Sequence, residues 1–98
     1  MNKEEILKMI RENKGKIKEF GVKRIGIFGS FVKDTATEKS DIDIIVEFEE
    51  GKKNFENFIN LAFFLEEILG RKIDLLTPES ISPYIKPYIE KEVIYERV

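Results

Sequence analysis

Cysteine and histidine are both missing from this 98-residue chain, and their absence excludes several kinds of chemistry. Without cysteine, there is no disulfide, no thiolate nucleophile and no thiolate metal site. Without histidine, there is no Ser-His-Asp or Cys-His catalytic arrangement and no typical zinc site. Any metal site must therefore be built from oxygen ligands, which favour Mg²⁺ or Mn²⁺.

The chain also lacks an excess of positive charge and any long hydrophobic run. Its formal net charge is −2, so nothing favours binding to a nucleic-acid backbone and no nucleic-acid partner is expected. No stretch approaches the roughly 18 apolar residues of a membrane-spanning helix, and the N-terminus has no apolar signal region. We therefore predict a cytoplasmic protein without a membrane partner, organised as a single domain over residues 1–98.

Helical and strand patterns alternate along the chain. They predict an α/β (α+β) domain with a small mixed β-sheet, helices on one face and the acidic residues on the other. Strands are expected over residues 22–28, 41–48 and 72–76, with a last extended piece over 93–95. Helices are expected from Asn2 to the break at Asn13, then to Gly21, over 54–69 and near Pro87. Residues 31–37 are ambiguous: they are compatible with a short helix that begins at the turn and is followed by a polar loop through Ser40.

The strand predicted over residues 41–48 carries the clearest functional signal. Side chains alternate along a strand, so Asp41 and Asp43 project from one face together with Ile45 and Glu47. The opposite face is the apolar one and carries Ile42, Ile44, Val46 and Phe48. Asp74 has the equivalent position in the next strand, so three carboxylates converge if the two strands are neighbours. Such carboxylates repel one another unless cations neutralise them. Two divalent ions about 3.5–4 Å apart can clamp a phosphoryl group during in-line displacement.

Each of these residues also has an ordinary structural interpretation. Asp41 is compatible with a turn, Asp43 with a solvated edge strand, and Gly29-Ser30 with a simple turn. A glycine nevertheless lets a ligand approach the backbone, and serine hydroxyl and N–H groups can hold phosphate oxygens. The order is more specific than its parts: a strand, Gly29-Ser30, ten residues, Asp-Ile-Asp in a strand, and Asp74 on a later strand.

This combination of motifs resembles the minimal nucleotidyltransferase (MNT) domain of the DNA polymerase beta superfamily. The resemblance rests on Gly29-Ser30, Ser40 to Asp43 and Lys72 to Leu76, with a matching lead-in over 20–28 and a matching ending over 87–95. It implies a polymerase-beta-like nucleotidyltransferase fold. It also implies that ATP is the substrate and that two divalent ions, Mg²⁺ or Mn²⁺, are the cofactor.

The resemblance assigns roles to individual residues. The catalytic and metal-binding residues would be Asp41, Asp43 and Asp74. The nucleotide-binding residues would be Gly29 and Ser30, with Lys33 and Ser40 as further candidates. Because the chain has no histidine, Asp74 is also the candidate to accept the proton of the attacking hydroxyl.

The chain departs from the family pattern directly after Gly-Ser. The family commonly continues with a variable residue and then Ala-Arg-Gly, whereas this chain has Phe31-Val32-Lys33-Asp34. Lys33 keeps the positive charge but loses the planar fork of arginine, and Asp34 replaces a flexible glycine. We expect metal ligation to survive, and the catalytic rate or the hold on the triphosphate to change. A solvated surface lysine is an equally good interpretation of Lys33.

The predicted helix over 54–69 is more apolar than one covered face requires. Residues 61–65 are apolar on every side, which predicts a second buried face. The C-terminal segment or another protein would cover that face, and a homo-oligomer is one form of the second case.

Three functions remain compatible with the sequence. The first is metal-dependent transfer of a nucleoside monophosphate, AMP from ATP, to a hydroxyl of a partner macromolecule. The resemblance to MNT proteins paired with HEPN ribonuclease toxins implies an antitoxin that modifies a tyrosine of the toxin. The second is a non-catalytic antitoxin that neutralises its partner by occlusion. The third, transfer to a small molecule or an RNA end, is disfavoured by the acidic charge and by the lack of room for an acceptor-binding domain.

Overall fold

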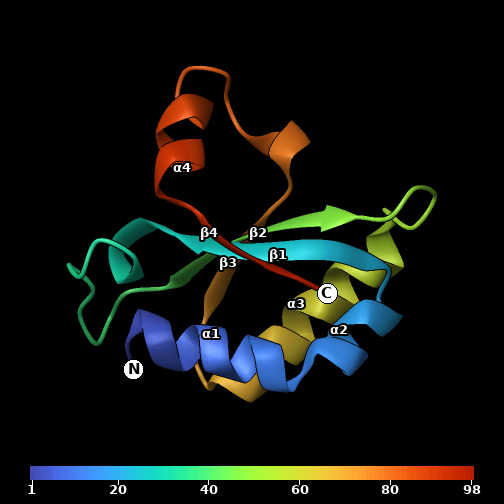
Figure 1. Cartoon of the computed structure of the whole chain (residues 1–98), viewed down its shortest axis with the longest axis horizontal. Helices are drawn as coiled ribbons and strands as arrows, with labels where there is room; N and C mark the ends of the chain where they lie inside the picture. Colours follow the sequence, from blue (N-terminus) through green and yellow to red (C-terminus); the bar gives the residue numbers. More distant parts are fainter.

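The computed structural model describes all residues 1–98. Its elements, in chain order, are α1 (Lys3–Glu12), α2 (Lys14–Glu19), β1 (Val22–Phe28), the 3-10 turn η1 (Gly29–Phe31), β2 (Ile42–Phe48), α3 (Phe55–Leu69), β3 (Ile73–Leu76), the 3-10 turn η2 (Pro78–Ser80), α4 (Lys86–Glu92) and β4 (Ile94–Arg97). The strands form one four-stranded sheet in the order β3-β2-β1-β4 (Figure 1). β1 is antiparallel to both β2 and β4, whereas β2 and β3 are parallel. The predicted mixed α/β sheet is therefore confirmed.

Helices α1, α2 and α3 cover one face of this sheet (Figure 1). Their apolar sides pack on β1 and β2 in a core cluster of 13 buried residues. From β2, the cluster includes Ile42, Ile44 and Val46, as the alternating pattern predicted. Thr77 is the one buried polar residue of the chain, and it lies outside this cluster.

The helix ends follow local signals in the sequence. Asn2 accepts a hydrogen bond from the Glu5 backbone N–H, and the Glu5 side chain accepts one from the Asn2 N–H, so a capping box starts α1. Asn54 accepts the Asn57 N–H at 2.8 Å at the start of α3. Gly70 ends α3 in the left-handed conformation, at φ +62°.

Residues 77–92, here called the arch, stand on the opposite face of the sheet (Figure 1). The arch contains η2 and α4, with Pro87 in the first turn of α4. Ile81 and Ile89 of the arch pack with Phe28 and Ile45 in a second, smaller buried cluster of four residues. Three helices thus lie on the face predicted for helices, and the short α4 is the exception.

The second apolar face of α3 is not covered by α4, because the arch lies across the sheet from it. Phe55 and Phe63 remain 79% and 63% exposed. Burial by another protein or by a second copy stays a prediction. The helices of this structure include none with the length and the apolar character of a membrane span.

Candidate functional site

Two of the predicted aspartates are direct neighbours at the end of the sheet where β2 begins. Asp43 is the register partner of Asp74 in the parallel β2–β3 pair, and of Phe28 in the antiparallel β1–β2 pair. Adjacent strands lie about 4.8 Å apart, so the Asp43 and Asp74 side chains leave the same face side by side. Asp41 is the residue that directly precedes β2. The condition set by the sequence, that the two strands be neighbours, is therefore met.

The electrostatics of the site centre on Asp43, which is half-buried while Asp41 and Asp74 are exposed. Burial raises the pKa of Asp43 above its ordinary value. The negative charges of Asp74, Asp41 and Glu92 raise this pKa further, in that order, and Lys33 partly opposes them. A partly buried carboxylate crowded by like charges is a common feature of functional sites.

The backbone places the three carboxylates close enough for their charges to interact, but their side chains are not oriented toward one common point. No three acidic side chains form a group arranged to hold a metal ion. The donor set nevertheless fits a hard cation, because it offers only oxygen ligands and carries the mutual repulsion that a cation would relieve. Asp41, Asp43 and Asp74 are the residues that would hold such a cation, after the exposed Asp41 and Asp74 side chains turn toward Asp43.

The Gly29-Ser30 turn lies directly against Asp43. Gly29 has φ +75°, a conformation that side-chain-bearing residues rarely adopt. A Cβ placed on Gly29 would lie 2.1 Å from Oδ2 of Asp43, well inside van der Waals contact. Only glycine therefore lets the turn approach the carboxylate this closely. A phosphate bound at the turn would lie beside the aspartates.

No α-helix follows this turn, so the short-helix interpretation of residues 31–37 is wrong. The chain makes one 3-10 turn, in which the N–H groups of Val32 and Lys33 both donate to the Gly29 carbonyl at 3.1 Å. Asp34 then adopts a left-handed φ of +61°, which ends the helical path. The site consequently has no helix N-terminus to help bind phosphate, and Ser30 and Lys33 remain as its candidate phosphate ligands.

The two further nucleotide-binding candidates differ in their surroundings. Lys33 lies at the site, with its Nζ 3.3 Å from Oε2 of Glu92 and its side chain 60% exposed. Ser40 instead closes a loop, because its hydroxyl accepts the Thr37 N–H at 2.8 Å and its carbonyl accepts from Arg71 at 3.1 Å. A role for Ser40 in nucleotide binding stays a prediction without a supporting contact.

Glu92 belongs to the site, although the resemblance over residues 87–95 assigned it no role. Its Oε1 accepts the Gly29 N–H at 2.9 Å, and its Oε2 faces Lys33. It is separated from Gly29 by 63 residues, and only the path of the arch over the sheet brings the two together. The one unusual sequence feature is a glutamate at the end of a helix, where basic residues are preferred.

Comparison with known proteins places the chain in a family. Residues 4–96 match the model of the nucleotidyltransferase domain family. The chain is a nucleotidyltransferase. The protein adenylyltransferase MntA of Thermococcus cleftensis is 41% identical over 93 residues, which cover 94% of this chain and 93% of that protein.

Solved structures agree with this assignment. A minimal nucleotidyltransferase structure has a TM-score of 0.81 and 28% identity, and the match covers 96% of this chain and 95% of that one. A toxin–antitoxin structure with AMP-PNP has a TM-score of 0.66 and 25% identity, with coverage of 97% and 72%. The expected fold and the assignment as an enzyme are confirmed.

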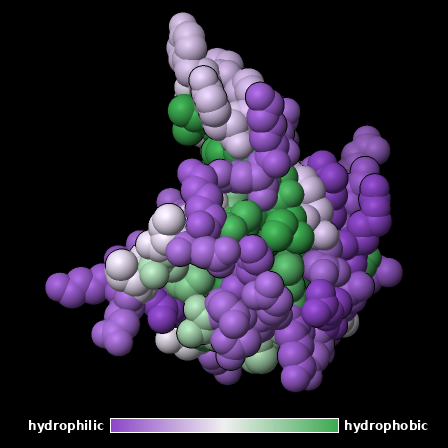
Figure 2. Space-filling model, turned by 60° about the vertical axis from the view of Figure 1, so that its left-hand side comes forward, coloured by the Kyte–Doolittle hydropathy of each residue, from purple (hydrophilic) through white to green (hydrophobic).

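In this nucleotidyltransferase, a groove of about 480 Å³ runs along the same face of the sheet, beneath the arch. It begins at Ile45, which follows Asp43 on that face, and continues past Glu47. Its apolar lining includes Ile81, Ile89 and Val93. In Figure 2, hydrophobic side chains are visible at the base of the projecting segment. The groove has the size of a small-ligand or side-chain site, but its lining includes none of the three predicted aspartates.

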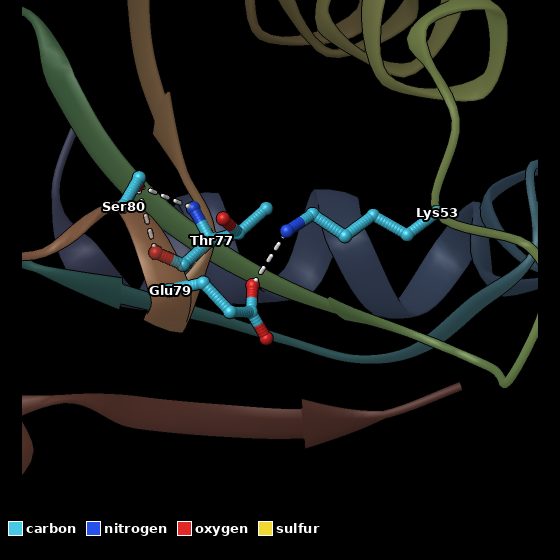
Figure 3. A network of polar contacts seen from close by, with 4 residues as sticks. All are labelled: Lys53, Thr77, Glu79 and Ser80. Atoms are coloured by element: carbon cyan, nitrogen blue, oxygen red, sulfur yellow. Dashed lines mark hydrogen bonds and ion pairs between the residues drawn. The ribbon is translucent and has the colours of Figure 1, made fainter.

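Polar contacts fasten the arch at the far end of the groove (Figure 3). Lys53 forms an ion pair with Glu79 at 2.9 Å, and this contact is the main reason that the pKa of Glu79 is lowered. The Ser80 hydroxyl donates to the Thr77 carbonyl at 2.8 Å and accepts the Thr77 N–H at 3.2 Å. These contacts lie at the rim and contribute no group to the carboxylate cluster.

Proposed function

We propose that this nucleotidyltransferase is a metal-dependent protein adenylyltransferase. It transfers AMP from ATP to a tyrosine hydroxyl of a HEPN-type toxin and thereby acts as an antitoxin. The observation that carries the proposal is the contact of the Gly29 turn with Asp43, where Asp74 is the neighbour in register. The choice of AMP and of a toxin partner is supported by the relative named protein adenylyltransferase MntA and by the likeness to a toxin–antitoxin structure with AMP-PNP.

The layout supports in-line displacement along the face of the sheet. The Gly29 turn lies against Asp43, and the lining of the groove includes Ile45, two residues further along β2. A triphosphate held by the turn would direct its β- and γ-phosphates away from the groove. In-line attack requires the acceptor to approach opposite to the leaving group, so the acceptor tyrosine would enter from the groove.

The proposed reaction exchanges one phosphorus–oxygen bond for another. The tyrosine oxygen bonds to the α-phosphorus, and the bond between the α-phosphorus and the bridging oxygen breaks. Pyrophosphate leaves with that electron pair, and Asp74 accepts the phenolic proton. Ser30 and Lys33 would bind the leaving phosphates. Divalent cations held by the three aspartates would lower the pKa of the hydroxyl and neutralise charge on the leaving group.

The test is transfer of label from ATP to a purified HEPN-type toxin in the presence of Mg²⁺ or Mn²⁺. Label on the α-phosphate should appear on a toxin tyrosine, whereas label on the γ-phosphate should not. Absence of α-label under both metals would refute the proposed reaction, and transfer of γ-label would indicate a kinase instead.

Two glycine variants make a matched pair for this assay. Gly29→Ala should abolish transfer, because the new methyl group would displace the Asp43 carboxylate and strain the backbone. Gly15→Ala in α2 should leave transfer unchanged, because a Cβ there meets nothing within 4 Å. Equal activity of the two variants would contradict the placement of the phosphate site at Gly29.

A second function, neutralisation by occlusion without catalysis, is favoured by two observations. The stretch after Gly29-Ser30 departs from the family pattern at Lys33 and Asp34, and Phe55 and Phe63 are exposed on α3. This alternative predicts that Asp43→Asn still protects cells from the toxin. Loss of protection by an Asp43→Asn protein that still binds the toxin would exclude it.

A further inference from the structure

The carboxylate of Glu92 binds the Gly29 turn and Lys33, the groups to which the proposed function assigns phosphate binding. One oxygen accepts the Gly29 N–H at 2.9 Å and the other lies 3.3 Å from Lys33. The side chain is only 20% exposed, so it is enclosed by the site rather than free in solvent. An anion therefore already binds to the turn and to the lysine that the proposed reaction assigns to the triphosphate.

The position of Glu92 is electrostatically unfavourable in two respects. It is the last residue of α4, where the helix dipole disfavours negative charge. It also lies close enough to Asp43 to act on it as a like charge. Gly29 and Lys33 compensate for both effects, which makes Glu92 dependent on the same groups that a phosphate would need.

We propose that Glu92 is an internal competitor for the nucleotide, which occupies the Gly29–Lys33 cradle and is displaced when the triphosphate binds. The proposal rests on the proposed function of this site. A backbone N–H has one hydrogen, so the Gly29 donor cannot fully serve both a carboxylate and a phosphate oxygen. The triphosphate would also have to enter beside an uncompensated carboxylate, at a cost in affinity.

Displacement needs a side-chain rotation and not a movement of the arch. The chain immediately after Glu92 is held against β1, because a Cβ on Gly26 would lie 2.7 Å from Cγ2 of Val93. Lys33, by contrast, is mostly exposed and has a flexible stem. The lysine can therefore follow the incoming phosphate while the Glu92 carboxylate turns toward solvent.

The test is the affinity for MgATP without an acceptor, measured by calorimetry on the full chain. Glu92→Ala should bind MgATP about tenfold more tightly than wild type, since about 1.4 kcal/mol corresponds to a tenfold change. Glu92→Gln should lie between the two, because it removes the charge but keeps an acceptor for Gly29. Glu67→Gln, an equal charge change on an exposed position of α3, should match wild type.

Unchanged or weaker binding by both Glu92 variants would overturn the inference and make Glu92 a support for the turn. If MgATP binds to wild type but no tighter to the variants, the inference fails while the proposed function stands. If MgATP binds neither to wild type nor to any variant, both the inference and the proposed function fail. The NMR resonance of the Gly29 amide gives a second readout. The Glu92→Ala substitution and the binding of MgATP to wild type should each shift this resonance, while the rest of the spectrum remains that of the folded protein. A Gly29 resonance that does not shift in Glu92→Ala would contradict the hydrogen bond between Gly29 and Glu92.

Discussion

The two faces of the sheet have opposite characters. On the face covered by α1, α2 and α3, 13 buried apolar residues form one continuous cluster. On the face beneath the arch, only four apolar residues are buried, and carboxylates and a groove take the remaining space. Along β2 the two characters alternate residue by residue, from Asp43 on the open face to Ile44 in the core. Stability and chemistry are therefore separable by substitutions at adjacent positions.

The sharpest separation is expected at Asp43. Asp43→Asn should lower nucleotidyl transfer on the order of 10³-fold or more, because several kcal/mol of charge stabilisation in the transition state are lost. The same variant should unfold at an equal or higher temperature than wild type without metal, since it removes a half-buried charge crowded by Asp74 and Asp41. Transfer assays and thermal unfolding check the two parts. An Asp43→Asn variant that keeps wild-type activity would contradict the assignment of the chemistry to the open face.

The next effect compares Ile44 and Ile45, which are both buried but on opposite faces. Ile44→Ala should destabilise the fold by about 3–4 kcal/mol, because its cavity lies inside a closed core. Ile45→Ala should cost about 1–2 kcal/mol less, because its surroundings open into the groove and can relax. Chemical denaturation of both variants measures the difference. Equal losses would mean that the two faces are packed alike.

The pH dependence of stability should report the crowding on the open face. The folded protein holds the Asp43 proton more tightly than the unfolded chain, because the pKa of Asp43 is raised. Protonated Asp43 therefore contributes to the free energy of unfolding at low pH, and this contribution is lost as pH increases from about 4 through the raised pKa. Without metal, the stability of wild type relative to Asp43→Asn should decline over this range. A relative stability that increases with pH would indicate a carboxylate stabilised in its charged form.

The smallest effect is expected at Asp34, in the loop that follows the phosphate turn. Asp34→Val should lower stability by about 1–2 kcal/mol, because a β-branched residue is strained at φ +61°. Asp34→Gly should change stability by less than about 1 kcal/mol, since relief of strain is offset by greater freedom of the unfolded chain. Differential scanning calorimetry resolves these values. An Asp34→Val protein as stable as wild type would argue against the left-handed turn.

Features set by local chemistry were predictable from the sequence. The alternation in β2 assigned Asp43 and Ile44 to opposite faces, and Asn54 and Gly70 marked the ends of α3. The 3-10 turn after Gly29 was not predictable, because the left-handed residue that ends it is an aspartate and not a glycine.

Features set by long-range packing lay outside the sequence pattern. Glu92 reaches Gly29 only because the arch crosses the open face, and nothing local in α4 indicates that path. The groove has the same origin, since Ile45 and Ile89 come from distant elements. Local periodicity therefore located the catalytic candidates, whereas their surroundings, the arch and the groove, required the structure.

The most direct test of the central claim, that the open face binds a metal–nucleotide complex, is thermal unfolding with and without MgATP. Ligand at about 100 times its dissociation constant should add roughly 2.7 kcal/mol of stability, which for a domain of this size raises the midpoint by on the order of 10 °C. Wild type should show this shift, and the Asp41→Asn/Asp43→Asn double variant should not. An equal shift in both proteins, or none in wild type with Mg²⁺ or Mn²⁺, would contradict the claim.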